Sequence, residues 1–253
     1  MYLIFQGAVG PWVRLPSLGD IGFTMVFVVF ALTHCAMVEG GRRMAIFFGV
    51  SAVVSYLMEE AGVRTGLVYG AYHYGPMLGP KLVDVPVLIP LAWFMMIYPS
   101  WMVAKVLLEG LPRYSVAGLT AHAVTAALVM TAWDVEMDPG MVVDGNWVWE
   151  KGGAYFGVPR HNYVGWLATT FLVYWITGWL VRNMAYRDAK GKWYEALPVI
   201  VYAFLAVRYV MANKFAAIQL IGVFSMGTPA LIAMLRLWLA KTAPTKEALP
   251  VAP

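Results

Sequence analysis

Residues Val85–Leu108 read VPVLIPLAWFMMIYPSWMVAKVLL, an apolar run in which Lys105 is the only charged side chain. A helix needs about 20 residues to cross the hydrocarbon core of a bilayer, so this run is long enough to span a membrane. Its three prolines, Pro86, Pro90 and Pro99, predict a helix that is kinked or locally unwound. The stretch indicates a membrane protein, and the rest of the chain contains further runs of the same kind.

The apolar runs number seven and are Ile21–Val38, Met44–Met58, Val85–Leu108, Val116–Trp133, Tyr163–Val181, Ala196–Val210 and Phe215–Ala240. The chain is 61% hydrophobic and 13% charged, whereas a soluble domain carries about 25% charged residues. Because the bilayer core leaves no water to bond exposed backbone groups, such runs have to be helices. The sequence therefore predicts an all-α, polytopic membrane bundle of about seven transmembrane helices. One domain is expected over residues 1–240, followed by a disordered tail over residues 241–253.

The two long connections, Glu59–Asp84 and Asp134–Asn162, fall on the same side of the membrane when seven spans are counted. They contain most of the acidic residues and many Trp, Tyr, Gly and Pro. Eleven of the 18 Lys and Arg residues lie on the other side, which favours a cytoplasmic location for that side and for the C-terminus. We therefore expect a multi-pass protein of the cell (inner, cytoplasmic) membrane. Residues Met1–Pro16 are expected to form an interfacial segment.

Carboxyl groups lie where these connections meet the apolar runs. Extending the second run to bilayer length puts Glu59 in its last turns, and Asp134 and Asp138 share a face at the end of the fourth run. The residue before a proline disfavours the α region, so this helix is expected to stop near Asp138. Acids at the edge of hydrocarbon are costly and usually functional, and a desolvated carboxyl can keep the proton that a general acid needs. The alternative interpretation, that the acids solvate helix ends or pair with Arg64, Lys81 or Arg160, is favoured for Glu60, Glu136 and Glu150.

Other classes of site have little support in the sequence. The four histidines have no second His or Cys at ligand spacing, so no metal site is expected. No lysine lies deep in the last apolar run, where a retinal Schiff base would need one. The glycines of GLVYGAYHYG lack the Lys-Ser/Thr pair of a phosphate loop, so no nucleotide site is expected either.

Aromatic side chains are dense around the acids. They make up 15% of the chain, and most of them are expected in the core or facing lipid. A wall of aromatic rings suits an apolar polyene, and each well-placed ring stabilises a cation by about 0.5 to 2 kcal/mol. The densest group lies within twenty residues and consists of Trp147, Trp149, Tyr155, Phe156, Tyr163 and Trp166.

Two long motifs stand out, EEAGVRTGLVYGAYHYGPMLGPKLVDVPVLIPLAWFMMIYPSW (Glu59–Trp101) and WDVEMDPGMVVDGNWVWEKGGAYFGVPRHNYVGW (Trp133–Trp166). They resemble the signatures of the CruF-type carotenoid biosynthesis membrane proteins. The resemblance implies a carotenoid hydratase, which adds water across the terminal (C-1′,2′) double bond of an acyclic ψ-end without a cofactor. Such ends occur in lycopene, γ-carotene and bacterioruberin precursors. The implied partners are the lipid-soluble carotenoid and membrane lipid, with other carotenoid-pathway enzymes or a second copy of the chain left open, and no nucleic acid.

At matching positions the resemblance points to Glu59 in ExxGVxTG, Asp134 and Asp138 in DxxxDP, and Asn162 and Trp166 in VPxxNxxGW. Our hypothesis is that Asp134 or Asp138 protonates the less substituted alkene carbon. Water oriented by Glu59 then captures the tertiary cation. The residues expected to contact the substrate are Tyr72, Tyr74, Trp93, Trp133, Trp147, Trp149, Tyr155, Phe156, Asn162 and Trp166.

Two other kinds of function remain open from the sequence. Another carotenoid or isoprenoid enzyme, such as an end-group cyclase, would use the same acid and cation but exclude water, so its product would keep the mass of the substrate. A proton-coupled carrier or a carotenoid-binding scaffold would leave the pigment unaltered. A carrier more often shows paired inverted repeats, and no repeat is evident in the sequence.

Overall fold

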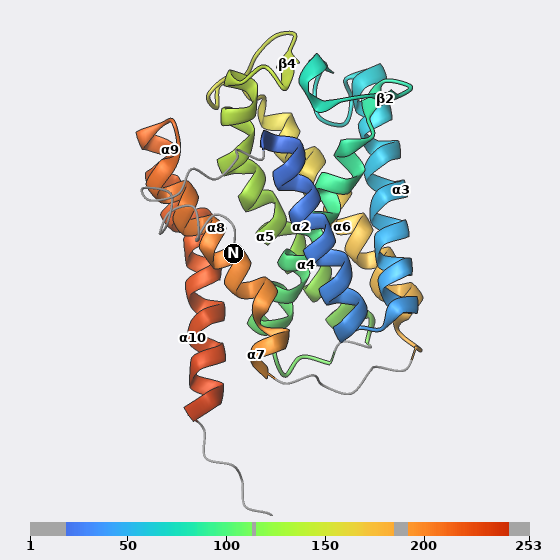
Figure 1. The fold of residues 1–253 in the computed structure, drawn as a ribbon, viewed down its shortest axis with the longest axis vertical. Coiled ribbons are helices and arrows are strands. Elements are labelled where there is room, and N and C mark those ends of the chain that lie inside the picture. The colour runs from blue at the N-terminus through green and yellow to red at the C-terminus, as the bar shows by residue number, and fades with distance from the viewer. Residues whose placement is uncertain (1–18, 113–114, 185–191, 243–253) are drawn as a thin grey trace, which may run out of the picture.

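The structure, a computed structural model, describes residues 19–112, 115–184 and 192–242. Most of its helices run side by side along one direction (Figure 1). They are α2 (Gly19–Val38), α3 (Gly41–Thr65), α4 (Leu88–Leu107), α5 (Val116–Val143), α6 (Arg160–Val181), α7 (Lys192–Glu195), α8 (Leu197–Ala212), α9 (Ala216–Gly222) and α10 (Thr228–Thr242). A π-helical segment, η2 (Val223–Gly227), joins the last two. The fold is the all-α bundle that the composition predicts.

Six helical segments of the described chain are long and apolar enough to cross a bilayer. They are Ile21–Val38, Gly41–Thr65, Leu88–Leu107, Val116–Val143, Arg160–Val181 and Ala216–Leu239. The sixth predicted span, Ala196–Val210, corresponds to α8, an apolar helix of 16 residues. The last span combines α9, η2 and α10. The chain is therefore a multi-pass membrane protein, with a shorter seventh helix packed among six long ones.

Helix α4 occupies the middle of the bundle and packs against α2, α3, α5, α8 and α10. It begins at Leu88, later than predicted, because Pro86 lies in the short strand β3 (Val85–Pro86). Pro90 falls in the first turn, where a backbone N–H would have no helical partner to lose. The local unwinding predicted for this span is not observed, since α4 is continuous through Pro99.

Helix α5 does not stop near Asp138, as the sequence predicted, but continues to Val143 with Pro139 inside it. A proline in a helix removes the hydrogen bond to the carbonyl four residues earlier, which is the carbonyl of Val135. The hydroxyl of Tyr155 donates a hydrogen bond to this Val135 oxygen at 3.3 Å. A side chain from the following loop thus replaces the lost backbone donor, and the helix extends by another turn.

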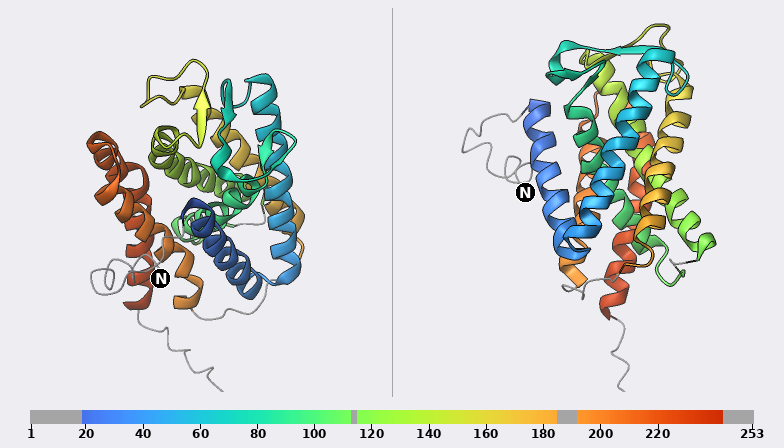
Figure 2. Two further views of the ribbon diagram at one scale, coloured as in Figure 1. Left: turned by 45° about the horizontal axis from the view of Figure 1, so that its top comes forward. Right: turned by 90° about the vertical axis from the view of Figure 1, so that its right-hand side faces the viewer.

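The two long connections form one layer over the same end of the bundle, as predicted (Figure 2). Strand β1 pairs with β4 in antiparallel register, so the first long connection is joined to the second. Gly75 follows β1 at a point where an added Cβ would lie 2.2 Å from the carbonyl oxygen of Gly145, so only glycine fits this contact. The short elements of this loop layer are β1 (Tyr72–Tyr74), η1 (Pro76–Leu78), β2 (Lys81–Leu82), β3 (Val85–Pro86) and β4 (Trp147–Trp149).

Two predictions concern residues outside the described ranges. These are the interfacial segment over Met1–Pro16 and the part of the predicted tail over residues 243–253. The other two residues of that predicted tail, Lys241 and Thr242, belong to α10. The side of the membrane on which the loop layer lies stays a prediction.

Candidate active site

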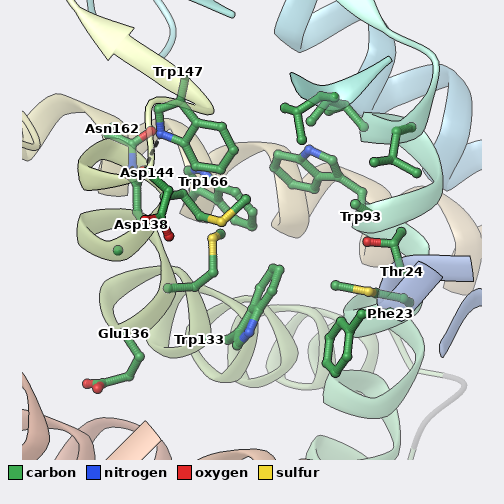
Figure 3. Close-up of a pocket in the computed structure, with 18 of the residues that line it drawn as sticks. Phe23, Thr24, Trp93, Trp133, Glu136, Asp138, Asp144, Trp147, Asn162 and Trp166 are labelled. Atoms are coloured by element: carbon green, nitrogen blue, oxygen red, sulfur yellow. Dashed lines mark hydrogen bonds between the residues drawn. The ribbon is translucent and has the colours of Figure 1, made fainter. Parts of the chain in front are cut away.

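A cavity of about 450 Å³ lies beneath the loop layer, between the ends of the helices. This volume falls within the range of about 300 to 1,000 Å³ that is usual for small-molecule sites. Trp93, Trp133 and Trp166 surround one space, with Asp138 at its edge (Figure 3). Ten of the catalytic and substrate-contacting residues predicted from the sequence line the cavity. They are Glu59, Tyr72, Tyr74, Trp93, Trp133, Asp138, Trp147, Trp149, Asn162 and Trp166.

Glu59 lies on α3, buried against the cavity and held by neutral donors. The indole N–H of Trp93 donates to Oε1 at 3.0 Å, and the hydroxyls of Tyr74 (2.7 Å) and Tyr72 both donate to Oε2. Burial, followed by the nearby Glu59 charge, raises the pKa of Tyr72 and Tyr74 well above the usual tyrosine value. These hydroxyls therefore keep their protons and act as donors. A carboxylate has about four acceptor sites, so Glu59 retains one for a further donor.

Tyr69, which the sequence analysis did not single out, also lines the cavity. An added Cβ would lie 2.7 Å from its ring at Gly62 on α3 and 2.6 Å from it at Gly165 on α6. Its hydroxyl is 2.9 Å from the hydroxyl of Thr169 on α6. The ring is thus wedged between two helices at positions where only glycine leaves room. Both glycines belong to the motifs Glu59–Trp101 and Trp133–Trp166. A glycine near the acids in each motif was the sequence signal that a side chain packs closely against these helices.

Asp134 and Asp138 lie one turn apart on α5 and share the side-chain amide of Asn162 on α6. Asn162 Nδ2 donates to Asp134 Oδ2 at 2.9 Å and to Asp138 Oδ2 at 2.8 Å. The indole N–H of Trp147 donates to Asp138 Oδ1. Asp134 Oδ1 is buried and bonds to no described residue. Asp138 therefore meets two donors and lines the cavity, whereas Asp134 meets one donor and lies behind the lining.

The ion pairs of the described residues involve other acids, namely Glu39, Glu60, Asp84 and Asp144. None of them involves Glu59, Asp134 or Asp138. Burying a charged carboxylate without a cation is expensive, even where neutral donors bond to it. The described ranges also contain no group of three His, Cys, Asp or Glu side chains arranged as a metal site would need.

The aromatic wall of the cavity is built by tryptophans from three helices. Trp93 of α4 stacks on Trp166 of α6 with ring centroids 4.1 Å apart and planes at 14°. Trp133 of α5 meets the edge of Trp166 at 5.9 Å. Trp147 and Trp149 of β4 complete the wall from the loop layer, next to Tyr74 and Tyr72 respectively. The rings leave an apolar space bounded by faces and edges of indoles, with carboxyl groups on two of its sides.

Tyr155 and Phe156 do not line the cavity, although the sequence grouped them with the substrate-contacting residues. Phe156 packs against Phe215, which precedes α9, with ring centroids 4.9 Å apart. Tyr155 packs edge-on against Phe156 and Tyr163, and its hydroxyl supports α5 at Pro139. Burial raises the pKa of Tyr155 to about 12, so its hydroxyl remains a donor. The structure thus brings these two rings against the outer side of α5.

Glu136 was predicted to solvate a helix end or to pair with a base, and this prediction is wrong. Its side chain is 0% exposed, and the residue lines the cavity. Oε1 accepts a hydrogen bond from Ser225 of η2 at 2.8 Å, while an added Cβ on Gly222 would lie 2.8 Å from Oε2. Because α5 continues past Pro139, Glu136 lies inside the helix and faces the π-helical segment. By contrast, the favoured interpretation of Glu60 is confirmed, since it pairs with Arg64 at 2.6 Å.

The chain matches the family of carotenoid biosynthesis proteins over residues 21–236. A curated relative, the bisanhydrobacterioruberin hydratase of Haloarcula japonica, is 33% identical over 155 residues, which are 58% of this chain and 51% of the relative. The match thus spans about half the length of that relative. No solved structure matches the chain. Because the family match covers most of the chain and both acidic motifs, the chain belongs to the CruF-type carotenoid biosynthesis protein family.

Proposed function

We propose that this protein is a carotenoid hydratase that adds water across the terminal (C-1′,2′) double bond of an acyclic ψ-end. The observation that carries the proposal is a buried pair of carboxyl groups, Asp134 and Asp138, joined by one Asn162 amide at the edge of a tryptophan-lined cavity. The name of the Haloarcula japonica relative, a hydratase, supports the same reaction class. The enzyme is a carbon–oxygen hydro-lyase of the cell membrane that needs no cofactor.

The proton donor is the Asp134–Asp138 pair, with Asp138 as the member that reaches the substrate. Two carboxylates that share one amide and form no ion pair within the described ranges repel each other, so one proton on the pair removes a buried charge. In the first step the carboxyl O–H bond of Asp138 breaks, and the alkene π electrons form a new C–H bond at the less substituted carbon. The positive charge is left on the tertiary carbon. Asn162 holds both carboxyls in place throughout.

Other residues that line the cavity stabilise the cation and bind the attacking water. Indole faces of Trp93, Trp133 and Trp166 stabilise the tertiary cation by about 0.5 to 2 kcal/mol each. Glu59 has one acceptor site left after its three donors, and this site holds the water that forms the C–O bond. The proton released from that water returns to the Asp134–Asp138 pair. Proton and charge therefore balance within one turnover, and nothing besides water is consumed.

Expression in a lycopene-producing bacterial host tests this proposal, with extracted pigments separated by chromatography and weighed by mass spectrometry. We expect a more polar pigment heavier by one water with the unaltered chain. The Asp138→Asn variant should not form it. Asp84→Asn is the matched control, because Asp84 is half-exposed, pairs with Arg64 and lies outside the cavity lining. A cyclic isomer of equal mass would point to a cyclase, and bound but unaltered pigment to a scaffold.

A further inference from the structure

The cavity extends past the aromatic wall to the gap between α2 and α8. Phe23 and Thr24 of α2 line it on one side, and Arg208 and Tyr209 of α8 line it on the other. Both helices pack against α4, and Met95 of α4 also lines the cavity. The space therefore continues from the buried acids toward the lateral surface of the bundle, and not only toward the loop layer.

A weak cation–π contact joins the two sides of the rim. The guanidinium carbon of Arg208 lies 5.7 Å from the centroid of the Phe23 ring. Cation–π contacts of exposed side chains are weak, and Arg208 itself is exposed. A contact of this kind can open and close without unfolding either helix.

The surface around the rim has the character of a lipid-facing surface. On α2 the neighbours of the rim residues are exposed and apolar, with Met25 at 41% and Val26 at 47% exposure. On α8 the residue before Arg208 is Val207, at 55% exposure. Apolar side chains exposed on a membrane-spanning helix face hydrocarbon. A substrate dissolved in the bilayer would therefore meet this gap directly.

The size of the cavity limits how much of a carotenoid it can hold. A volume of about 450 Å³ suits a ligand of drug size. A full-length acyclic carotenoid is comparable in length with the hydrocarbon core of a bilayer, about 30 Å. The cavity can hold an end group and the first isoprene units, while the rest of the polyene has to lie elsewhere.

We propose that the gap between α2 and α8 is a lateral portal, at which Phe23 and Arg208 form the gate. One end of the carotenoid passes through it from the lipid and reaches Asp138, and the remaining polyene stays in the membrane. This inference rests on the proposed function, whose substrate it defines as one end group presented from the bilayer. For a substrate with two ψ-ends, the two hydrations are separate binding events.

The portal is tested by narrowing it without touching the acids. Thr24 is 5% exposed and lines the cavity, so Thr24→Trp places an indole in the passage. Val26→Trp is the matched control, since Val26 lies on the same helix, is 47% exposed and does not line the cavity. Each variant, in membranes, is given lycopene or a hydrocarbon of two isoprene units that ends in the same trisubstituted alkene.

We expect Thr24→Trp to lower lycopene hydration at least about tenfold, the scale on which a pocket rejects excess bulk. The loss on the short hydrocarbon should be smaller, because that molecule lies wholly inside the cavity after entry and leaves the passage empty, and Val26→Trp should leave both rates unchanged. Phe23→Ala, which removes the rim ring, should raise the initial rate on lycopene. Equal lycopene rates for Thr24→Trp and Val26→Trp would overturn the portal, as would equal losses on both substrates with Thr24→Trp.

Failure of the hydratase proposal gives a different result, because the unaltered chain would then hydrate neither substrate. In that case the portal is tested by the amount of pigment that co-purifies with each variant from lycopene-producing cells. Less pigment with Thr24→Trp than with Val26→Trp would support the portal, and equal amounts would overturn it.

Discussion

The two ends of the bundle both bury acidic side chains, but they satisfy them with different partners. At the end away from the loop layer, Glu39 meets two cations, Arg43 at 3.1 Å and Lys105 at 3.5 Å. Arg43 also donates to the backbone carbonyls of Val181 and Met184, so the cluster ties α6 to α3. The charges of this cluster compensate one another, and its function is to hold helices together.

At the loop end the partners of the buried acids are tyrosine, tryptophan, asparagine and serine, all of them neutral. A neutral donor positions a carboxyl group without fixing its charge, so the group can gain or lose a proton. A cation, by contrast, holds its partner in the ionised form. The comparison indicates that burial alone does not mark a reactive acid. What marks Glu59, Asp134 and Asp138 is burial without an ion pair to any described cation.

The largest effect is expected from removing the proton of Asp138. Asp138→Asn keeps the size of the side chain but cannot donate an acidic proton, so hydration should fall by about 10² to 10⁴-fold, the usual contribution of general acid catalysis. Initial rates with membranes and lycopene measure this. The thermal unfolding midpoint of the purified variant has to stay close to that of the unaltered chain. A variant that is stable and still hydrates would remove Asp138 from the mechanism.

Breaking the cation cluster should instead affect stability. Arg43→Gln leaves Glu39 with one cation and two helix-end carbonyls with a weaker donor. The free energy of unfolding should fall by about 3 kcal/mol, since each hydrogen bond to a charged group contributes about 1.5 to 3 kcal/mol. Thermal unfolding in detergent measures the change, and Arg42→Gln on the exposed neighbour is the control. The rate of hydration per folded molecule should stay equal to that of the unaltered chain. If Arg43→Gln lost activity without losing stability, the division between the two ends would be wrong.

A smaller effect is expected at Glu59. Tyr72→Phe or Tyr74→Phe removes one donor from its carboxylate, and hydrogen bonds to charged groups contribute about 1.5 to 3 kcal/mol. We expect hydration to fall by roughly one to two orders of magnitude on that scale. The matched control is Tyr56→Phe, whose hydroxyl bonds to the Leu82 carbonyl outside the cavity. Equal rates for all three variants would show that Glu59 has no role in positioning water.

The smallest effect is expected from Tyr155→Phe, which removes the donor that replaces the hydrogen bond lost at Pro139. The Val135 carbonyl would be left without this partner, at a cost of about 1 kcal/mol in stability. Thermal unfolding measures this loss. The double variant Pro139→Ala, Tyr155→Phe tests whether the missing hydrogen bond to the Val135 carbonyl causes it. The restored backbone N–H should recover the loss. No recovery would mean that Tyr155 acts through its ring contacts.

The sequence predicted the class of fold and the meeting of the acids, because both depend on simple counting. Apolar runs of bilayer length give the helices, and the even number of spans between the two long connections, two, puts Glu59 and Asp138 at the same end. The burial of Glu136 could not be predicted, since it depends on α5 continuing past Pro139. That extension depends on a hydrogen bond from Tyr155, a loop residue whose position no local pattern reveals.

The aromatic residues show the same limit. Their density predicted a wall beside the acids, and Trp147, Trp149 and Trp166 of the dense group line the cavity. Density does not tell which side of a loop a ring occupies, and Phe156 turns toward Phe215 instead. The proposed portal could not be predicted from the sequence either. Phe23 and Arg208 are far apart in the sequence and meet through the packing of α2 and α8 on α4.

If a buried carboxyl pair protonates the alkene before water adds, the proton that it delivers to carbon can be followed by running the reaction in heavy water. Membranes containing the unaltered chain are incubated with lycopene in D₂O, and the product is returned to ordinary water before mass spectrometry. We expect a hydrated pigment that retains one deuterium on the carbon next to the tertiary alcohol, and none of this product with Asp138→Asn. A hydrated pigment without carbon-bound deuterium, or the same labelled product from Asp138→Asn, would contradict it.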